Sequence, residues 1–168
     1  MARDATARLY DVDASLMTLD KKAGVITFQA KKGRLVDLDQ LHESIWATRL
    51  GDRTGMELKR LEVTAVGEVV FTDREVLLKV RGSDQHFVLG DDSAGGPVMG
   101  RLRDAVKNGE KEFRVTGRVE GWTGNFTKLT SKLPGKPRRI LVSEFEAARC
   151  GPGSAGGVRG VAHEGQGE

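Results

Sequence analysis

The chain has a single cysteine and no long apolar run, and each scarcity excludes a class of protein. Its single cysteine, Cys150, excludes an intramolecular disulfide and a multi-cysteine zinc site, which fits a reducing cytoplasm. No apolar run approaches the roughly 20 residues that span a bilayer, so we expect no contact with a membrane. The first eight residues, MARDATAR, lack the apolar segment of a secretory signal. We therefore expect a soluble cytoplasmic protein.

The basic residues are unevenly placed along the chain. A length of 168 residues is enough for one ordinary domain or two small ones. The chain is 38% hydrophobic and 30% charged, and its formal net charge is +3. Segment 97–139 alone holds eleven Lys or Arg and four acids. A local basic surface attracts phosphates and other anions. The alternative interpretation is a solvated face without a ligand.

The first part of the chain has the pattern strand, strand, helix, strand. Apolar residues alternate with polar ones from Tyr10 to Leu16 and again in Val25 to Ala30, with a turn at Lys21–Gly24, which predicts a hairpin. Asp37 or Asp39 can cap a helix that runs from Asp37 to Leu50 with one apolar stripe. A return strand is expected near Met56 to Val66.

The second part has the pattern of a small barrel. Turn signals and alternation predict three strands, then a helix, then two strands. The expected elements are strands at Val63–Phe71, Val76–Arg81 and Gln85–Leu89, a helix at Pro97–Lys107, and strands at Phe113–Trp122 and Arg139–Ala147. This order is that of the OB-fold, a five-stranded Greek-key barrel. From residue 149 onward the chain is rich in glycine, which predicts a disordered tail.

The strand Tyr10–Ala14, the hairpin strand Gly24–Phe28 and the helix Leu38–Ile45 resemble the heavy-metal-associated domain. This family is the ferredoxin-like βαββαβ module of copper chaperones and metal-transport ATPases. In the family, the first strand leads into a Cys-x-x-Cys loop and a helix, and the two thiolates bind soft ions such as Cu(I). That strand, loop and helix have no counterpart in this chain, so no metal ligand and no cofactor is carried over.

The resemblance and the patterns together predict an α+β protein with two modules. Residues 1–61 would form a partial ferredoxin-like ββαβ module, residues 62–148 an OB-like five-stranded β-barrel with one helix, and residues 149–168 a disordered tail. The missing strand and helix would leave one sheet edge and one face uncovered. Three explanations remain open: a truncated reading frame, cover of that face by the barrel, or binding of a protein partner or a second copy of the chain.

No group of residues indicates catalysis, so we expect a protein that is not an enzyme. His42 has no second ligand at a compatible spacing. The loop Gly90–Gly100 lacks the Gly-Lys-Ser/Thr ending of a phosphate-binding loop. Asp91 and Asp92 are adjacent carboxylates without a partner base, and no triad motif occurs.

The predicted barrel contains the candidate binding residues. Single-strand-binding OB-folds combine a basic groove with aromatic side chains on which bases stack. The residues of that type are Arg114, Arg118, Trp122, Phe126 and Lys128. Core or loop-packing roles for the aromatic residues are the alternative.

Three functions follow from the sequence. The leading hypothesis, based on the resemblance, is a non-enzymatic accessory or binding protein in metal handling that lacks a direct metal site. The second is an OB-type module that binds nucleic acid or anions. The third is a structural domain that dimerises through the uncovered face.

Overall fold

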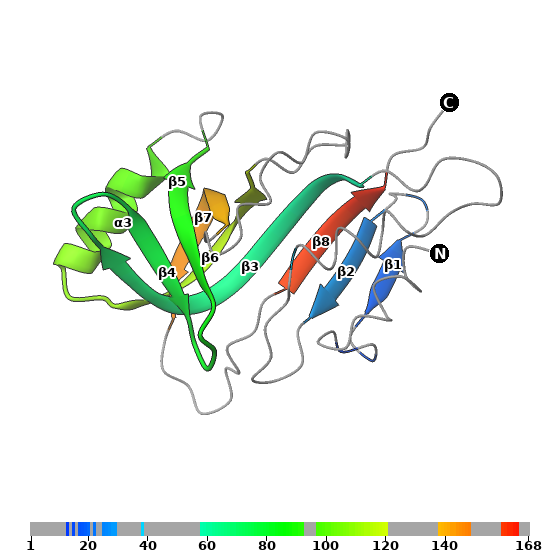
Figure 1. The fold of residues 1–168 in the computed structure, drawn as a ribbon, viewed down its shortest axis with the longest axis horizontal. Helices are drawn as coiled ribbons and strands as arrows, with labels where there is room; N and C mark the ends of the chain where they lie inside the picture. Colours follow the sequence, from blue (N-terminus) through cyan, green and yellow to red (C-terminus); the bar gives the residue numbers. More distant parts are fainter. Residues whose placement is uncertain are drawn as a thin grey trace.

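The computed structural model describes residues 13, 15, 17–20, 22, 25–29, 38, 58–92, 97–120, 138–148 and 159–164. The elements in chain order are β1 (Thr18–Asp20), β2 (Val25–Gln29), β3 (Leu58–Phe71), β4 (Val76–Val80), β5 (His86–Asp91), α3 (Val98–Lys107), β6 (Glu112–Val119), β7 (Arg139–Ala147) and β8 (Arg159–Glu164). The eight strands form one sheet in the order β1-β2-β8-β3-β4-β5-β7-β6, and β6 pairs again with β3 (Figure 1).

Five of these strands close into a barrel. β3 pairs with β4 through Gly67–Phe71 and with β6 through Glu62–Glu68, and both pairings are antiparallel. β5 and β7 complete the ring through a parallel pairing. The barrel contains three strands, then α3, then two strands, as predicted. It is consistent with a small OB-like barrel.

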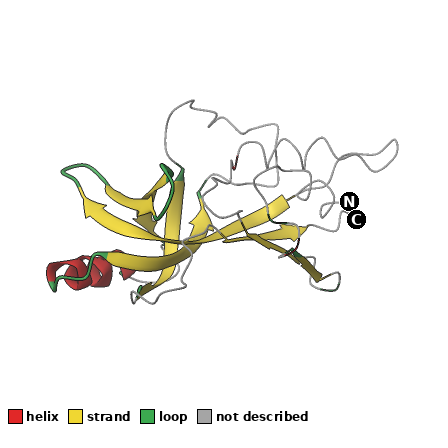
Figure 2. Ribbon diagram, turned by 90° about the horizontal axis from the view of Figure 1, so that it is seen from below, coloured by secondary structure: helices red, strands yellow, loops and turns green. Residues whose placement is uncertain are grey.

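Helix α3 closes the end of the barrel that lies away from β1, β2 and β8 (Figures 1 and 2). It begins after Pro97 and ends before Asn108, which confirms the bounds expected from the sequence. Gly109 follows with a φ of 98°, a left-handed conformation that glycine adopts without strain. Val98 and Leu102 are fully buried against the barrel interior.

Strand β3 joins the barrel to the rest of the sheet. The return strand and the first barrel strand, predicted separately, are one strand of 14 residues. It crosses the boundary that we expected between residues 61 and 62. Its inward residues Leu61, Val63 and Ala65 are fully buried. They belong to one core that also includes Met17, Phe28 and Leu38 from the N-terminal part.

The N-terminal hairpin is confirmed, but its first strand is not where the sequence pattern put it. β1 is Thr18–Asp20 and pairs antiparallel with β2. Asp13, inside the expected strand at 10–16, instead accepts hydrogen bonds from the Ser15 amide at 3.0 Å and the Ser15 hydroxyl. Such side-chain turns compete with extended structure. Of the helix expected at 37–50, only Leu38 lies within the described residues, and it is helical.

The segment predicted as a disordered tail contains a strand. β8 pairs antiparallel with β2 on one edge and with the first half of β3 on the other. It therefore covers one edge of β2 and one edge of β3. Composition was a poor guide here because the backbone groups of β8 are satisfied by strands more than 90 residues away in sequence, which no local pattern reveals. The remainder of the predicted tail lies outside the described residues.

We predict that Gly67→Ala destabilises the protein. Gly67 pairs with Val80 in β4 and with Phe113 in β6, at the point where β3 enters the barrel. A methyl group at this position would overlap the carbonyl oxygen of Lys79. Such crowding costs about 1–3 kcal/mol of the free energy of unfolding, measured by urea denaturation.

Gly100→Ala is the matched control. A Cβ at Gly100, inside α3, meets no atom within 4 Å. Because alanine favours a helix over glycine, this change should stabilise the protein by about 0.5–1 kcal/mol. Equal effects of the two substitutions would contradict the close packing assigned to Gly67.

Candidate functional site

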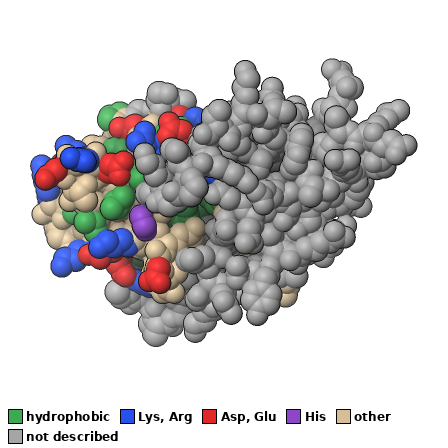
Figure 3. All heavy atoms as spheres, viewed as in Figure 1, with side chains coloured by type: hydrophobic (Ala, Val, Ile, Leu, Met, Phe, Trp, Pro, Cys, Tyr) green, Lys and Arg blue, Asp and Glu red, His purple; other side chains and the backbone are tan. Residues whose placement is uncertain are grey.

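The outer face of β3, β4 and β5 has an apolar row. Strand register places Val70, Leu77 and Val88 side by side across the three strands. Their neighbours in sequence point into the barrel, since side chains alternate between the faces of a strand. Val88 is 5% exposed although it lies outside the core cluster. Figure 3 shows hydrophobic side chains gathered on this side of the barrel among charged ones.

Basic side chains border that row. Lys79 and His86 are opposite each other on β4 and β5, and both are exposed. Arg139 pairs with Val88 across the parallel β5–β7 ladder. None of these three residues was among the binding residues predicted from the sequence. The sequence pattern did place them on the outer face, because each is next to a buried apolar residue of its own strand.

A second basic group lies at the end of β6 and the start of β7. Arg118 contacts the Asp92 carboxylate at 3.7 Å, and Arg139 contacts that of Glu120 at 3.5 Å. The Glu120 amide donates to the Arg139 carbonyl at 2.9 Å, which holds the two ends of the connection together. The connection itself, residues 121–137, lies outside the described residues.

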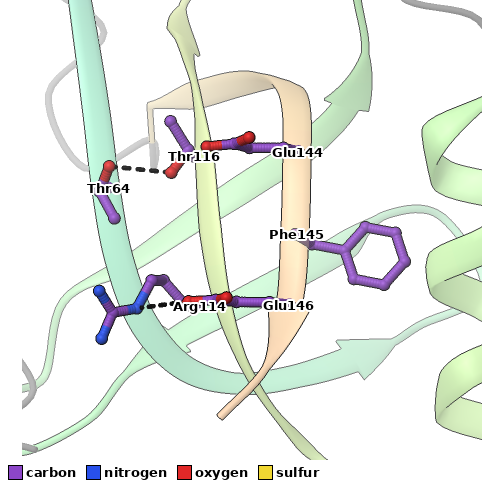
Figure 4. A pocket seen from close by; sticks show the side chains of 6 residues that line it. All are labelled: Thr64, Arg114, Thr116, Glu144, Phe145 and Glu146. Atoms are coloured by element: carbon purple, nitrogen blue, oxygen red, sulfur yellow. Dashed lines mark hydrogen bonds and ion pairs between the residues drawn. The ribbon is translucent and has the colours of Figure 1, made fainter.

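Arg114 lies on the outer face of β6 beside an open hollow of about 340 Å³. Its Nε atom is 3.1 Å from Glu146 Oε1 (Figure 4). The hydroxyls of Thr64 and Thr116 share a hydrogen bond of 2.9 Å in the same hollow. The Phe145 side chain points away from these groups, toward the helix.

The hollow has more acidic than basic side chains. Glu144 and Glu146 face it together with Arg114. With two carboxylates against one guanidinium, this hollow attracts a phosphate less well than the β6–β7 end of the barrel does.

The structure brings only part of the predicted binding site together. Arg114 and Arg118 both lie on the outer face of β6, with different acidic partners. Trp122, Phe126 and Lys128 lie in the connection outside the described residues. The five-residue site therefore stays a prediction.

The adjacent carboxylates Asp91 and Asp92 have separate structural roles. Asp91 accepts a hydrogen bond of 2.8 Å from the Met99 amide in the first turn of α3. This bond satisfies one of the free amides at the helix N-terminus, as a capping residue does. Asp92 faces Arg118 instead. Asp91 thus links β5 to the first turn of α3, whereas Asp92 contacts a side chain of β6.

Comparison of the chain with protein-family models, curated proteins and solved structures finds no match. The resemblance to the heavy-metal-associated domain consequently stays a prediction. Among the described residues, no cluster of three or more His, Cys, Asp or Glu is arranged to hold a metal ion. Within the same residues, no helix is long and apolar enough to cross a membrane.

Proposed function

We propose that the protein is a non-enzymatic binding protein and that its OB-like barrel binds single-stranded nucleic acid. Barrels of this type bind ligands on the face of their second and third strands and on the loops after the first and fourth strands. In this chain those strands are β4 and β5, and the loops are Thr72–Glu75 and the β6–β7 connection. The basic and apolar residues described above border this region.

The charge of the β6–β7 connection is the observation that carries the proposal. From Arg118 to Arg139 the chain has six Lys or Arg and one acid, Glu120. Arg118 and Arg139, which stand at its two ends, have side chains that are 41% and 48% exposed. Trp122 and Phe126 supply aromatic rings within the same segment. A basic groove with aromatic side chains is the combination that holds single strands.

The ion pairs at this end of the barrel are weak enough to yield to a phosphate. The Arg118–Asp92 and Arg139–Glu120 contacts are longer than 3.4 Å and partly exposed to solvent. Exposed pairs of this kind contribute about 1 kcal/mol or less. A phosphate can accept two parallel hydrogen bonds from one guanidinium, which is a stronger interaction.

We predict that a fluorescent oligothymidine binds the full chain at low salt, with an affinity that falls as salt is raised. Arg118→Ala should weaken binding and reduce the slope of log K against log salt by about 0.7, the effect of one lost phosphate contact on a single strand. Trp122→Ala should cost about 1–3 kcal/mol if a base stacks on the indole.

Arg101→Ala is the matched control for this titration. Arg101 is an exposed arginine on α3 and belongs neither to β6 nor to the β6–β7 connection. Its removal changes the net charge as much as Arg118→Ala does. Because Arg101 is not one of the proposed binding residues, Arg101→Ala should leave the slope unchanged. No binding at low salt, or equal losses from the two arginines, would overturn the proposed function.

An accessory role in metal handling is the second candidate; it rests on the resemblance to the heavy-metal-associated domain, and the strand order agrees with the fold of that family. The order β1-β2-β8-β3 has antiparallel neighbours throughout. This is the order of a ferredoxin-like sheet in which β8 replaces the first strand. The Cys-x-x-Cys motif is absent from the sequence, so the role would not include a thiolate pair of its own.

We predict that the full chain and its Cys150→Ala variant compete equally poorly with a Cu(I) chelator. A lone thiolate binds Cu(I) less tightly than a pair held on one loop. Tight Cu(I) binding by both proteins would reveal a metal site without cysteine and contradict this account.

A further inference from the structure

Strand β8 fills a slot between two strands that do not pair with each other. Residues 159–163 pair with β2, and residues 159–164 pair with β3, with one irregularity between Leu58 and Arg60. β2 and β3 have no ladder of their own in the sheet order. Without β8, both would present unpaired backbone groups along the slot, and such edges bind another strand readily.

The register fits the slot to the sequence of β8. Gly160 pairs with Phe28 and Val63, whose side chains are 1% and 0% exposed. Two residues later, Ala162 pairs with Ile26 and Leu61. Residues directly opposite on antiparallel strands share a face. The slot thus takes a strand with the smallest residues at alternate positions, between large neighbours.

Strand β8 is joined to the barrel by a long connection. Ala148, whose amide donates to the Glu112 carbonyl at 2.8 Å, is the last described residue before the connection. Ten residues, 149–158, separate it from β8, and four of them are glycine. Fully extended, they reach about 35 Å, which exceeds the diameter of a small domain.

We propose that the slot between β2 and β3 is a self-association site in which two copies of this chain exchange their β8 strands. A second copy fits the slot because its β8 has the sequence whose register with both β2 and β3 is known. A second copy supplies the same sequence, and therefore the same ladders. This inference does not depend on nucleic-acid binding by the barrel.

The exchange has a simple energetic basis. The closed monomer and the exchanged dimer contain the same β8 pairings, so the two forms differ mainly in the connection and in the entropy of association. Exchange requires β8 to leave its slot, so it is expected during unfolding and refolding. The dimer fraction then increases with the protein concentration at which the chain refolds.

A disulfide trap tests the exchange directly. Glu62 and Val161 are Cα partners across the β3–β8 ladder. In a Cys150→Ala background, one chain receives Glu62→Cys and a second, of different mass, receives Val161→Cys. The two are mixed, unfolded, refolded at several concentrations and oxidised. A cross-strand disulfide forms only when β8 of one copy lies in the slot of the other.

Two controls make the result interpretable. Glu62→Cys mixed with Ser143→Cys measures random oxidation, since Ser143 is an exposed residue of β7 that does not pair with Glu62. A single chain with both Glu62→Cys and Val161→Cys reports whether the register exists within one copy.

The proposal predicts a 62–161 heterodimer that exceeds the 62–143 product by at least about fivefold at the highest refolding concentration, and that declines on dilution. An intrachain disulfide in the double variant without heterodimer at any concentration would overturn the exchange. Absence of both products would also overturn it, because β8 would then not occupy the slot.

Discussion

The continuous strand β3 is the constraint on which the rest of the structure depends. Over its 14 residues, one edge pairs first with β8 and then with β4, while the other edge pairs with β6. Barrel closure and the attachment of β1, β2 and β8 thus use the backbone groups of a single strand. Its inward side chains also join the barrel interior to Phe28 and Leu38 in one core.

Local signals predicted the elements whose bounds depend on nearby residues. Pro97 and the Asn108–Gly109 pair set the ends of α3, and alternation located β4, β5, β6 and β7 to within a few residues. The alternation of the apolar residues Leu61, Val63 and Ala65 with polar ones indicated that β3 is one continuous strand. Its two halves were predicted separately because the return strand was assigned to the N-terminal module, which ended at residue 61, and the first barrel strand to the next module.

Long-range pairing produced the features that the sequence did not reveal. The Gly-rich composition around β8 predicts disorder, yet its edges are completed by β2 and β3. Asp13 was assigned to a strand because periodicity counts side-chain polarity and not side-chain hydrogen bonds. In the candidate site, Arg114 and Arg118 were predicted from their charge and the aromatic residues near them in sequence. Their acidic partners lie elsewhere in the chain, Glu146 in β7 and Asp92 directly after β5.

The central claim is that β3 makes the barrel and the N-terminal strands one cooperative unit. Differential scanning calorimetry of the full chain tests it most directly, because separate modules with separate cores unfold separately. The account predicts a single transition in which the calorimetric and van't Hoff enthalpies agree. Two resolved transitions, with the barrel unfolding apart from β1, β2 and β8, would contradict it.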